Sequence, residues 1–262
     1  LWFNSLKGFE GTDGTAGIIN LTLKKNLELI EDSVAFLKGK GRRVFYDAEH
    51  FFDGYKADPD YALQTLLKAQ AAGAERIILC DTNGGTMPWE VRRIVAEIVR
   101  EVRTPLGIHA HNDAEMAVAN SLIAIQEGVL QVQGTINGIG ERCGNANLSS
   151  IIPNLNFKMK LPSVTPDQLR NLREVSHFVA EIANLVPNKH QPYVGDSAFA
   201  HKGGVHIDAV RKNPMTYEHV RPEAVGNRQR MLISDYEGKR SLAAKAEEFH
   251  ITLRMKDSKA RE

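Results

Sequence analysis

The stretch GIHAHNDAE at residues 107–115 carries two histidines one residue apart at the end of an apolar run. Side chains two residues apart in a β-strand point to the same face, so His109 and His111 are predicted to lie on one side of a strand. Two neutral imidazoles with oxygen donors nearby suit a divalent zinc, manganese, cobalt or magnesium ion that keeps positions open for substrate. For an isolated HxH pattern, the alternative is a strand whose histidines only make hydrogen bonds.

The elements that must position these histidines alternate along the chain. Strands are predicted in RRVFYDAE, ERIILCDT, PLGIHAHND and LQVQGTING, with helices over 21–41, 58–73, 88–102 and 114–128. The helix over 58–73 begins with Asp58 as a cap and Pro59 at its first position, and it stops at Gly73. This alternation indicates repeated βα units and a parallel sheet covered by helices.

Polar residues stand at or just beyond the end of each predicted strand. They are Asp47 and Glu49, Asp81 and Thr82, the two histidines, and Thr135 and Asn137. In a (β/α)₈ barrel, this end of the strands carries the chemistry. About four βα units are visible, whereas a closed barrel needs eight. The predicted fold class is therefore α/β, the C-terminal part of a (β/α)₈ TIM barrel followed by a mainly helical subdomain.

The pattern changes near LPSVTPDQ, where two prolines indicate a boundary. We expect a partial TIM-barrel catalytic domain over 1–159 and a separate helical region over 160–262. The second region contains a predicted helix over 167–186 and then the Gly-rich stretch YVGDSAFAHKGGVHIDAV.

Composition excludes several classes of function. Lys plus Arg number 33 against 32 Asp plus Glu, for a net charge of +1, and the basic residues are scattered, which argues against nucleic acid as a partner. No apolar run reaches the roughly 18 residues of a membrane span, and no secretory signal is visible. Two cysteines are too few for a disulfide framework, so a cytoplasmic setting is expected.

The chain starts at Leu1 and stops soon after an unfinished helical pattern, so we expect both ends to be cut.

Longer stretches resemble one enzyme family. YDAEHFFDGYKADPDYAL, LCDTNGGTMP, GIHAHNDAEMAVANS and QGTINGIGERCGNANLSSIIPNL are similar to the isopropylmalate and homocitrate synthases and related metal-dependent aldol lyases, over about residues 20–240. YDAEHFFDGYK resembles the citramalate synthase branch in particular. The resemblance implies a TIM barrel, a divalent metal ion (Mg, Mn, Zn or Co) and acetyl-CoA as co-substrate. It also implies a Claisen-type condensation with a 2-oxo acid, which is pyruvate in the citramalate branch, by a homodimer acting on small molecules.

Matched motif by motif, the resemblance implies roles for eight residues. It implies that His109, His111 and Asn145 bind the metal ion and that Tyr46 and Thr82 bind the substrate. Glu49, His206 and Asp208 are the implied catalytic residues. The last two belong to a GxHxD element that commonly reaches the barrel mouth from the neighbouring subunit.

Each role has a simpler structural alternative. Glu49 could pair with a nearby lysine or arginine, and Asn145 could cap a helix. Asp113 is expected to cap the helix that follows it, and Asp47 and Asp81 to hold loops. The remaining histidines are expected to be solvated, namely His50, His177, His190, His201 and His219.

Several alternative functions stay open. The DxTLRDG motif of the family's first strand, with its metal-ligating Asp, is absent from these residues, so the isolated chain is expected to be catalytically incomplete, or an inactive fragment. A 2-isopropylmalate or homocitrate synthase and a related aldol lyase share the motifs. An amidohydrolase also uses HxH, but on its first strand with further histidines on later strands.

Overall fold

The computed structural model describes residues 2–4 and 22–232. It divides into two compact units, Leu1–Ile151 and Ile152–Glu262, so the first unit ends before the predicted boundary at residue 159. The two chain ends, which the sequence analysis expects to be cut, lie outside the described residues. Within the part of the chain that is described, no helix is long and apolar enough to cross a membrane.

The first unit is built on a parallel sheet of five strands that follow one another in chain order. The strands are β1 (Trp2–Asn4), β2 (Phe45–Glu49), β3 (Arg76–Asp81), β4 (Leu106–Ala110) and β5 (Gln131–Gln133). All four predicted strands are confirmed, and β1 is an additional one. The sheet is therefore the α/β arrangement that the alternating pattern predicts.

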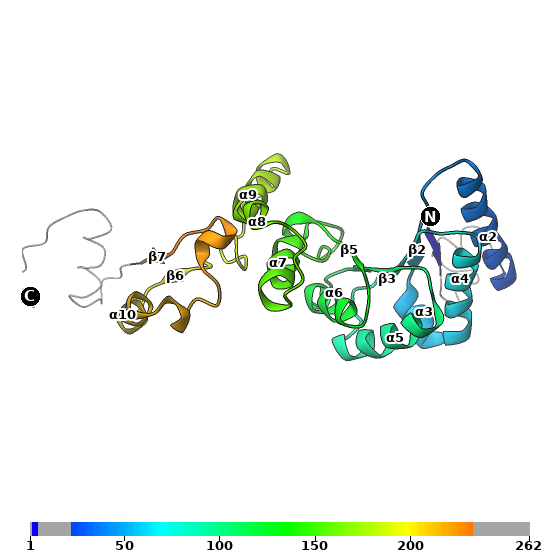
Figure 1. Ribbon diagram of the computed structural model, residues 1–262, viewed down its shortest axis with the longest axis horizontal. Helices are drawn as coiled ribbons and strands as arrows, with labels where there is room; N and C mark the ends of the chain where they lie inside the picture. Colours follow the sequence, from blue (N-terminus) through cyan, green and yellow to red (C-terminus); the bar gives the residue numbers. More distant parts are fainter. Residues whose placement is uncertain (1, 5–21, 233–262) are drawn as a thin grey trace, which may run out of the picture. The chain divides into compact units, whose positions relative to one another are not determined.

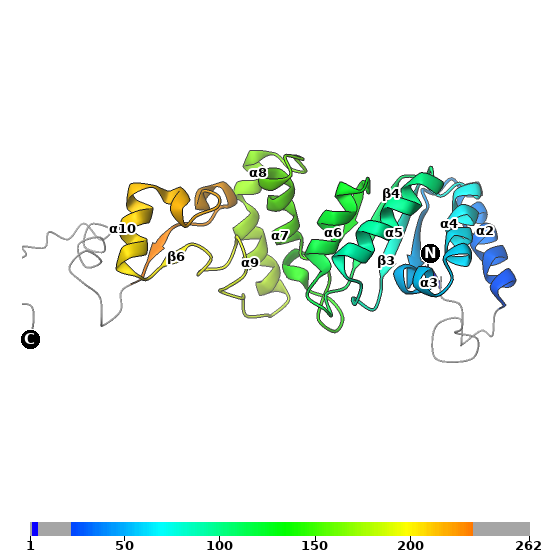
Figure 2. The ribbon, with the colours of Figure 1, turned by 90° about the horizontal axis from the view of Figure 1, so that it is seen from below.

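Helices connect the strands and lie along one side of the sheet (Figure 1). They are α2 (Leu23–Gly39), α3 (Phe51–Ala57), α4 (Pro59–Ala71), α5 (Pro88–Glu101) and α6 (Ala117–Gln126). Figure 2 shows α2 beside α4, and α5 beside α6. Four of these helices are predicted from the sequence, and α3 is not. It starts directly after His50, a residue in the left-handed conformation with a φ of 56°.

The predicted ends of α4 are confirmed. Asp58 accepts a hydrogen bond from the Tyr61 amide at 3.1 Å, and Pro59 occupies the first turn, where its missing N–H costs nothing. After the last residues of the helix, Gly73 has a φ of +93°, which favours glycine.

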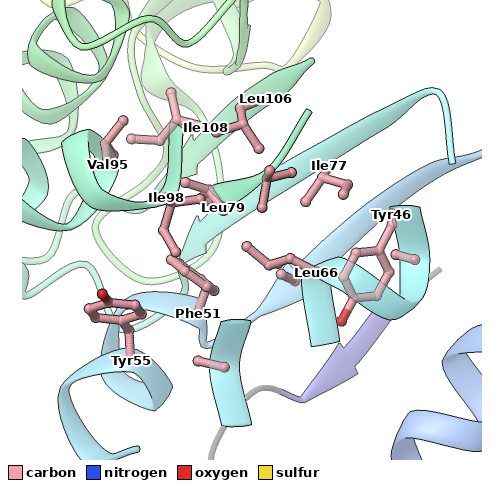
Figure 3. Close-up of a cluster of buried hydrophobic side chains, with 14 of the residues drawn as sticks. Tyr46, Phe51, Tyr55, Leu66, Ile77, Leu79, Val95, Ile98, Leu106 and Ile108 are labelled. Atoms are coloured by element: carbon pink, nitrogen blue, oxygen red, sulfur yellow. The ribbon is translucent and has the colours of Figure 1, made fainter. Parts of the chain in front are cut away.

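The two faces of the sheet differ in chemistry because side chains alternate along each strand. The face toward the helices belongs to the hydrophobic core, with strand residues Tyr46, Ala48, Ile77, Leu79, Leu106 and Ile108. Figure 3 shows Tyr46, Ile77, Leu79, Leu106 and Ile108 converging with Phe51 and Leu66 from the helices. The opposite face carries Asp47, Glu49, His109 and Gln133 at the carboxyl end of the strands, so polar groups gather there.

The second unit contains short helices and one small sheet. Its helices are α8 (Pro166–Arg170), α9 (Leu172–Ile182) and α10 (Gly204–Lys212), with short turns η2 (Asn154–Lys158), η3 (Pro214–Thr216) and η4 (Pro222–Val225). The strands β6 (Ala200–His201) and β7 (Arg230–Met231) pair in parallel. Two further elements precede this unit or span the division, η1 (Ile136–Gly138) and α7 (Leu148–Pro153).

Two local predictions in the second unit need correction. The single helix expected over 167–186 is two helices, α8 and α9, with Asn171 between them. The Gly-rich stretch YVGDSAFAHKGGVHIDAV, in which no helix is predicted, contains the start of α10 at Gly204.

Candidate functional site

His109 and His111 lie together at the carboxyl end of β4, as the alternation predicts. Their Nε2 atoms are 3.3 Å apart, and their ring centroids are 5.1 Å apart. His111 follows the last strand residue, and its backbone N–H donates to the Asp81 carbonyl at 3.2 Å, which holds it against the end of β3. The strand and its neighbour therefore fix both imidazoles with their Nε2 atoms facing each other.

A relay from Asp47 sets which nitrogen of His109 carries the proton. Gln133 donates from Nε2 to Asp47 Oδ1 at 3.2 Å, and its Oε1 lies 2.9 Å from His109 Nδ1. A carboxylate only accepts hydrogen bonds, so it orients the Gln133 amide with its oxygen toward the histidine. That oxygen also only accepts, so the proton of neutral His109 sits on Nδ1. Its Nε2 lone pair then faces His111.

Asn145 completes this cluster from the loop after β5. Its Nδ2 lies 3.0 Å from His109 Nε2, and its backbone forms a β-bridge with His111. A Cβ on Gly140 would come within 1.7 Å of Asn145 Oδ1, so only glycine leaves room for the amide there. Asn145 is not a helix cap, because Asn147 is the residue whose side chain accepts from the Ser149 amide at the start of α7.

The spacing of the two imidazoles fits a divalent cation. Two nitrogens that each lie about 2.0–2.1 Å from one ion can be no more than about 4.2 Å apart, and the two Nε2 atoms satisfy this. The other ring nitrogen of His111, Nδ1, is buried with no hydrogen-bond partner in the described structure, so no second partner fixes the tautomer of this imidazole. As a ligand, Asn145 would have to rotate its amide so that Oδ1 faces the ion. The described residues hold no group of three His, Cys, Asp or Glu side chains with metal-site spacing, so His109, His111 and Asn145 form a partial set.

The surroundings of His111 favour its neutral form. Burial is the largest effect that lowers the pKa of His111, followed by the charges of His109 and Arg142. A neutral imidazole is the form that binds metal ions, so the environment favours the form that a ligand needs.

Glu49 and Thr82 lie at neighbouring strand ends. Asp47 pairs with Ile78 in the register of β2 and β3, so alternation places Asp47 and Glu49 on the face of the sheet that carries Cys80. Burial raises the pKa of the Cys80 thiol most, and the charges of Asp47 and Glu49 raise it further. None of the ion pairs among the described residues involves Glu49, in contrast to the structural alternative. Thr82 Oγ1 accepts a hydrogen bond from the His50 amide at 2.8 Å.

Tyr46 is not at this site, and its predicted role in substrate binding needs correction. It is fully buried in the hydrophobic core, on the face of β2 that packs against the helices (Figure 3). Alternation along the strand is the reason, since Tyr46 and Ala48 point one way and Asp47 and Glu49 the other.

The three loops that follow β3, β4 and β5 are joined by Arg142. Its Nε and Nη2 donate to the two carboxylate oxygens of Asp113 at 2.8 and 3.0 Å, and Nη2 also lies 2.5 Å from the Thr82 carbonyl. Asp113 therefore pairs with Arg142 and does not cap α6, where Asn112 Oδ1 instead accepts from the Ala117 amide. The expectation that Asp81 holds a loop is confirmed, because its carboxylate accepts from the Thr86 hydroxyl at 2.7 Å.

Comparison with known proteins identifies the family. Residues 15–179, more than half of the chain, match the HMGL-like family. The chain belongs to the HMGL-like family. Residues 193–261 match the homocitrate synthase post-HMGL domain-like family, which follows the HMGL-like region here.

Several relatives share high sequence identity with this HMGL-like chain. An (R)-citramalate synthase of Geobacter sulfurreducens is 62% identical over 239 residues, covering 91% of this chain and 45% of the relative. An (R)-citramalate synthase of Synechocystis is 52% identical over 90% of this chain and 44% of the relative. A probable 2-isopropylmalate synthase of Methanopyrus kandleri is 36% identical over 90% of this chain. The chain spans about half the length of the curated relatives it matches.

Solved structures share the fold. The HMG-CoA lyase of Bacillus subtilis superposes with a TM-score of 0.59 at 17% identity, covering 71% of this chain and 64% of that structure. The hydroxymethylglutaryl-CoA lyase of Pseudomonas aeruginosa gives a TM-score of 0.59 at 19% identity, over 71% of this chain and 63% of that structure. These likenesses support the HMGL-like TIM-barrel fold of the first unit.

The second unit holds the remaining predicted site residues, outside the HMGL-like region. His206 lies on α10, and its ring packs against Tyr217 with centroids 4.3 Å apart. Asp208 forms an ion pair with Lys212 at 2.9 Å one turn along the same helix. His201 is not solvated as expected, because it is buried and its Nε2 lies 3.0 Å from the buried Glu218 Oε1.

Sequence reasoning missed Gln133 and Arg142 as site residues and underestimated Asp47. Register places Cys80, His109 and Gln133 in one row across β3, β4 and β5, so Gln133 is the cross-strand neighbour of a predicted ligand. The position of Gln133 near the end of a predicted strand could have indicated that it belongs to the site. Arg142 had no such signal in the HMGL-like sequence.

Proposed function

We propose that the protein is an (R)-citramalate synthase, which condenses acetyl-CoA with pyruvate to give citramalate and CoA in isoleucine biosynthesis. The observation that carries this proposal is the facing pair of imidazoles at a carboxyl strand end, in a chain 62% identical to a protein of that activity. The HMGL-like family and the match of residues 193–261 to a homocitrate synthase domain support the same reaction class.

His109, His111 and Asn145 are the residues that would hold a divalent Mg, Mn, Zn or Co ion. When bound, such an ion polarises the ketone of the oxo acid and neutralises the alkoxide that forms, which is worth several kcal/mol. The Asp47 and Gln133 relay keeps the Nε2 lone pair of His109 available for this ion.

The chain's own residues account for substrate binding and proton movement. Thr82 Oγ1 already accepts from the His50 amide, so its hydroxyl proton is left to donate to the pyruvate carboxylate. Glu49 projects to the polar face and has no ion pair among the described residues, which suits a group that takes or relays the proton of the acetyl methyl. His206 and Asp208 are proposed to act in the same proton transfer, with α10 supplied within a homodimer.

We propose that the five strands of the first unit are part of a closed (β/α)₈ barrel. Parallel strands in chain order, with helices along one side and polar residues on the other, are what such a barrel requires. The mainly helical region over 160–262 is proposed as the subdomain that carries the HKGGVHID element.

Free thiol release from acetyl-CoA tests the proposed function. Because residues 1–262 lack the DxTLRDG motif with its metal-ligating Asp, the protein is expressed with its upstream reading frame restored and purified. It is supplied with Mn²⁺ and with pyruvate in one reaction and 2-oxoisovalerate in the other. Release with pyruvate that a chelator abolishes is expected. His111→Ala should abolish the release, whereas His190→Ala, which changes an exposed histidine of the second unit, should leave it unchanged.

Other results would contradict the proposal. Release with 2-oxoisovalerate in place of pyruvate would assign a 2-isopropylmalate synthase, in line with the 36% identical relative. No release with either acid would leave a lyase or an inactive fragment. Full activity of His111→Ala would remove the metal site.

A further inference from the structure

Arg142 makes more contacts between loops than the proposed reaction requires of it. From the loop after β5, its guanidinium reaches Asp113 beyond β4, at 2.8 and 3.0 Å, and the Thr82 carbonyl beyond β3, at 2.5 Å. These partners are 29 and 60 residues away in the sequence. One side chain therefore ties together three loops at the carboxyl ends of three adjacent strands.

The surrounding backbone is adapted to this arrangement. Arg142 itself has a φ of 51°, in the left-handed region that non-glycine residues rarely adopt. Gly84 has a φ of +65°, and a Cβ there would come within 2.5 Å of Asp113 Oδ2. Arg142 and Gly84 therefore both have backbone conformations that most residues avoid, and both lie at the contacts of the guanidinium with Asp113. This indicates that these contacts determine the shape of the loops.

The tied loops are the ones that carry the candidate metal ligands. Asn112, between His111 and Asp113, donates its amide to the Gly144 carbonyl at 2.9 Å. Asn145, three residues after Arg142, donates its amide to the Gly138 carbonyl at 2.9 Å. The first of these bonds joins the loop that bears Arg142 to the strand end that bears the histidines, and the second closes that loop on itself beside Asn145.

We propose that Arg142 is a positioning residue that locks the loops after β3, β4 and β5 and thereby holds Asn145 and His111 in place for cation binding. The proposal rests on the proposed metal-dependent function. Arginine suits this task because its planar fork pairs with both oxygens of Asp113 and still directs an N–H to the Thr82 carbonyl. A lysine could supply the charge but not this geometry.

The test compares Arg142→Ala and Arg142→Lys with the parent protein. Arg93→Ala is the matched control, because Arg93 pairs with Glu97 on the exposed side of α5 and its loss changes the net charge equally. The affinity for Mn²⁺ alone is measured by titration calorimetry, and amide hydrogen exchange is measured at Asn112 and Asn145.

Arg142→Ala is expected to weaken Mn²⁺ binding about 10- to 100-fold, as loss of an outer partner of a metal site does. Arg142→Lys should fall between this variant and the parent, and Arg93→Ala should stay within about twofold of the parent. Exchange at the two amides should become at least about tenfold faster in Arg142→Ala, while the melting temperature of the core changes little.

Two outcomes would overturn the proposal. Unchanged exchange at both amides would show that Arg142 does not lock the loops, whether or not the ion binds. Faster exchange with unchanged Mn²⁺ affinity would show that the lock does not serve the ligands. A parent protein that binds no Mn²⁺ would instead count against the proposed function, and the exchange rates would still decide whether the lock exists.

Discussion

Gln133→Leu offers the sharpest test of how the site is organised. The substitution keeps the approximate shape of the side chain but removes the link between Asp47 and His109. The structure gives this link two hydrogen bonds, at 3.2 and 2.9 Å, on a half-buried residue. Each such bond contributes about 0.5–1.5 kcal/mol, so the free energy of unfolding should fall by about 1–3 kcal/mol.

The larger effect should be on the imidazole. With its Nδ1 partner lost, His109 is no longer held in the tautomer that directs the Nε2 lone pair toward His111. Loss of such a partner costs metal sites about 10- to 100-fold in affinity, or about 1.4–2.8 kcal/mol. Both consequences follow from one side chain, so they should appear together.

The assay combines Mn²⁺ titration with ¹⁵N chemical shifts of the His109 ring in the metal-free protein. Gln131→Leu is the control, because it makes the same chemical change two residues earlier on the same face of β5. The parent and the control should keep the proton of His109 on Nδ1, and Gln133→Leu should populate both tautomers. An unchanged tautomer together with unchanged Mn²⁺ affinity would refute the relay.

Two further predictions concern titratable side chains. Burial raises the pKa of the Cys80 thiol well above its usual range, whereas Cys143 is exposed, so iodoacetamide at pH 8 should modify Cys143 alone in the native protein. Mass spectrometry checks this, and equal modification of Cys80 before unfolding would contradict its burial. Arg173 and then Arg230, at 2.7 and 2.8 Å, lower the pKa of the Asp196 carboxyl below its usual range. Because the pKa of Asp196 is lower in the folded than in the unfolded protein, its negative charge stabilises the fold at pH values above the unfolded-state pKa of about 3.9. This stabilisation is lost as the pH falls through the folded-state pKa. Asp196→Asn should therefore lower the free energy of unfolding in urea more at pH 7 than at pH 3. The difference should be under about 1 kcal/mol, because the carboxylate is partly exposed. An equal loss at both pH values would contradict the ion pairs.

The sequence was sufficient for features that depend on local periodicity and local steric rules. Strand alternation put His109 and His111 on one face, and the caps of α4 followed from Asp58 and Pro59. The same rule could have placed Tyr46 in the core, since it stands one residue before Asp47 on a strand. Tyr46 was assigned to substrate binding because of the motif resemblance, although alternation along the strand predicts that it faces away from Asp47.

Features that need residues far apart in sequence were decided by the tertiary structure alone. The Gln133 contact with Asp47 joins residues 86 positions apart, on strands β5 and β2. Because β3 and β4 lie between these strands in the sheet, the contact depends on the register and the three-dimensional course of the whole sheet. In the second unit, burial of His201 against Glu218 likewise depends on how the chain folds back on itself.

The sequence by itself therefore determined the alternating α/β architecture, the end of the sheet that carries polar groups and the two histidines that face each other there. Only the tertiary structure decided which side chains set the tautomer of His109 and which arginine ties the loops together. The physical reason is that periodicity fixes the face and the end on which a side chain lies. Its partners across strands and loops depend on register and packing, which are properties of the whole fold.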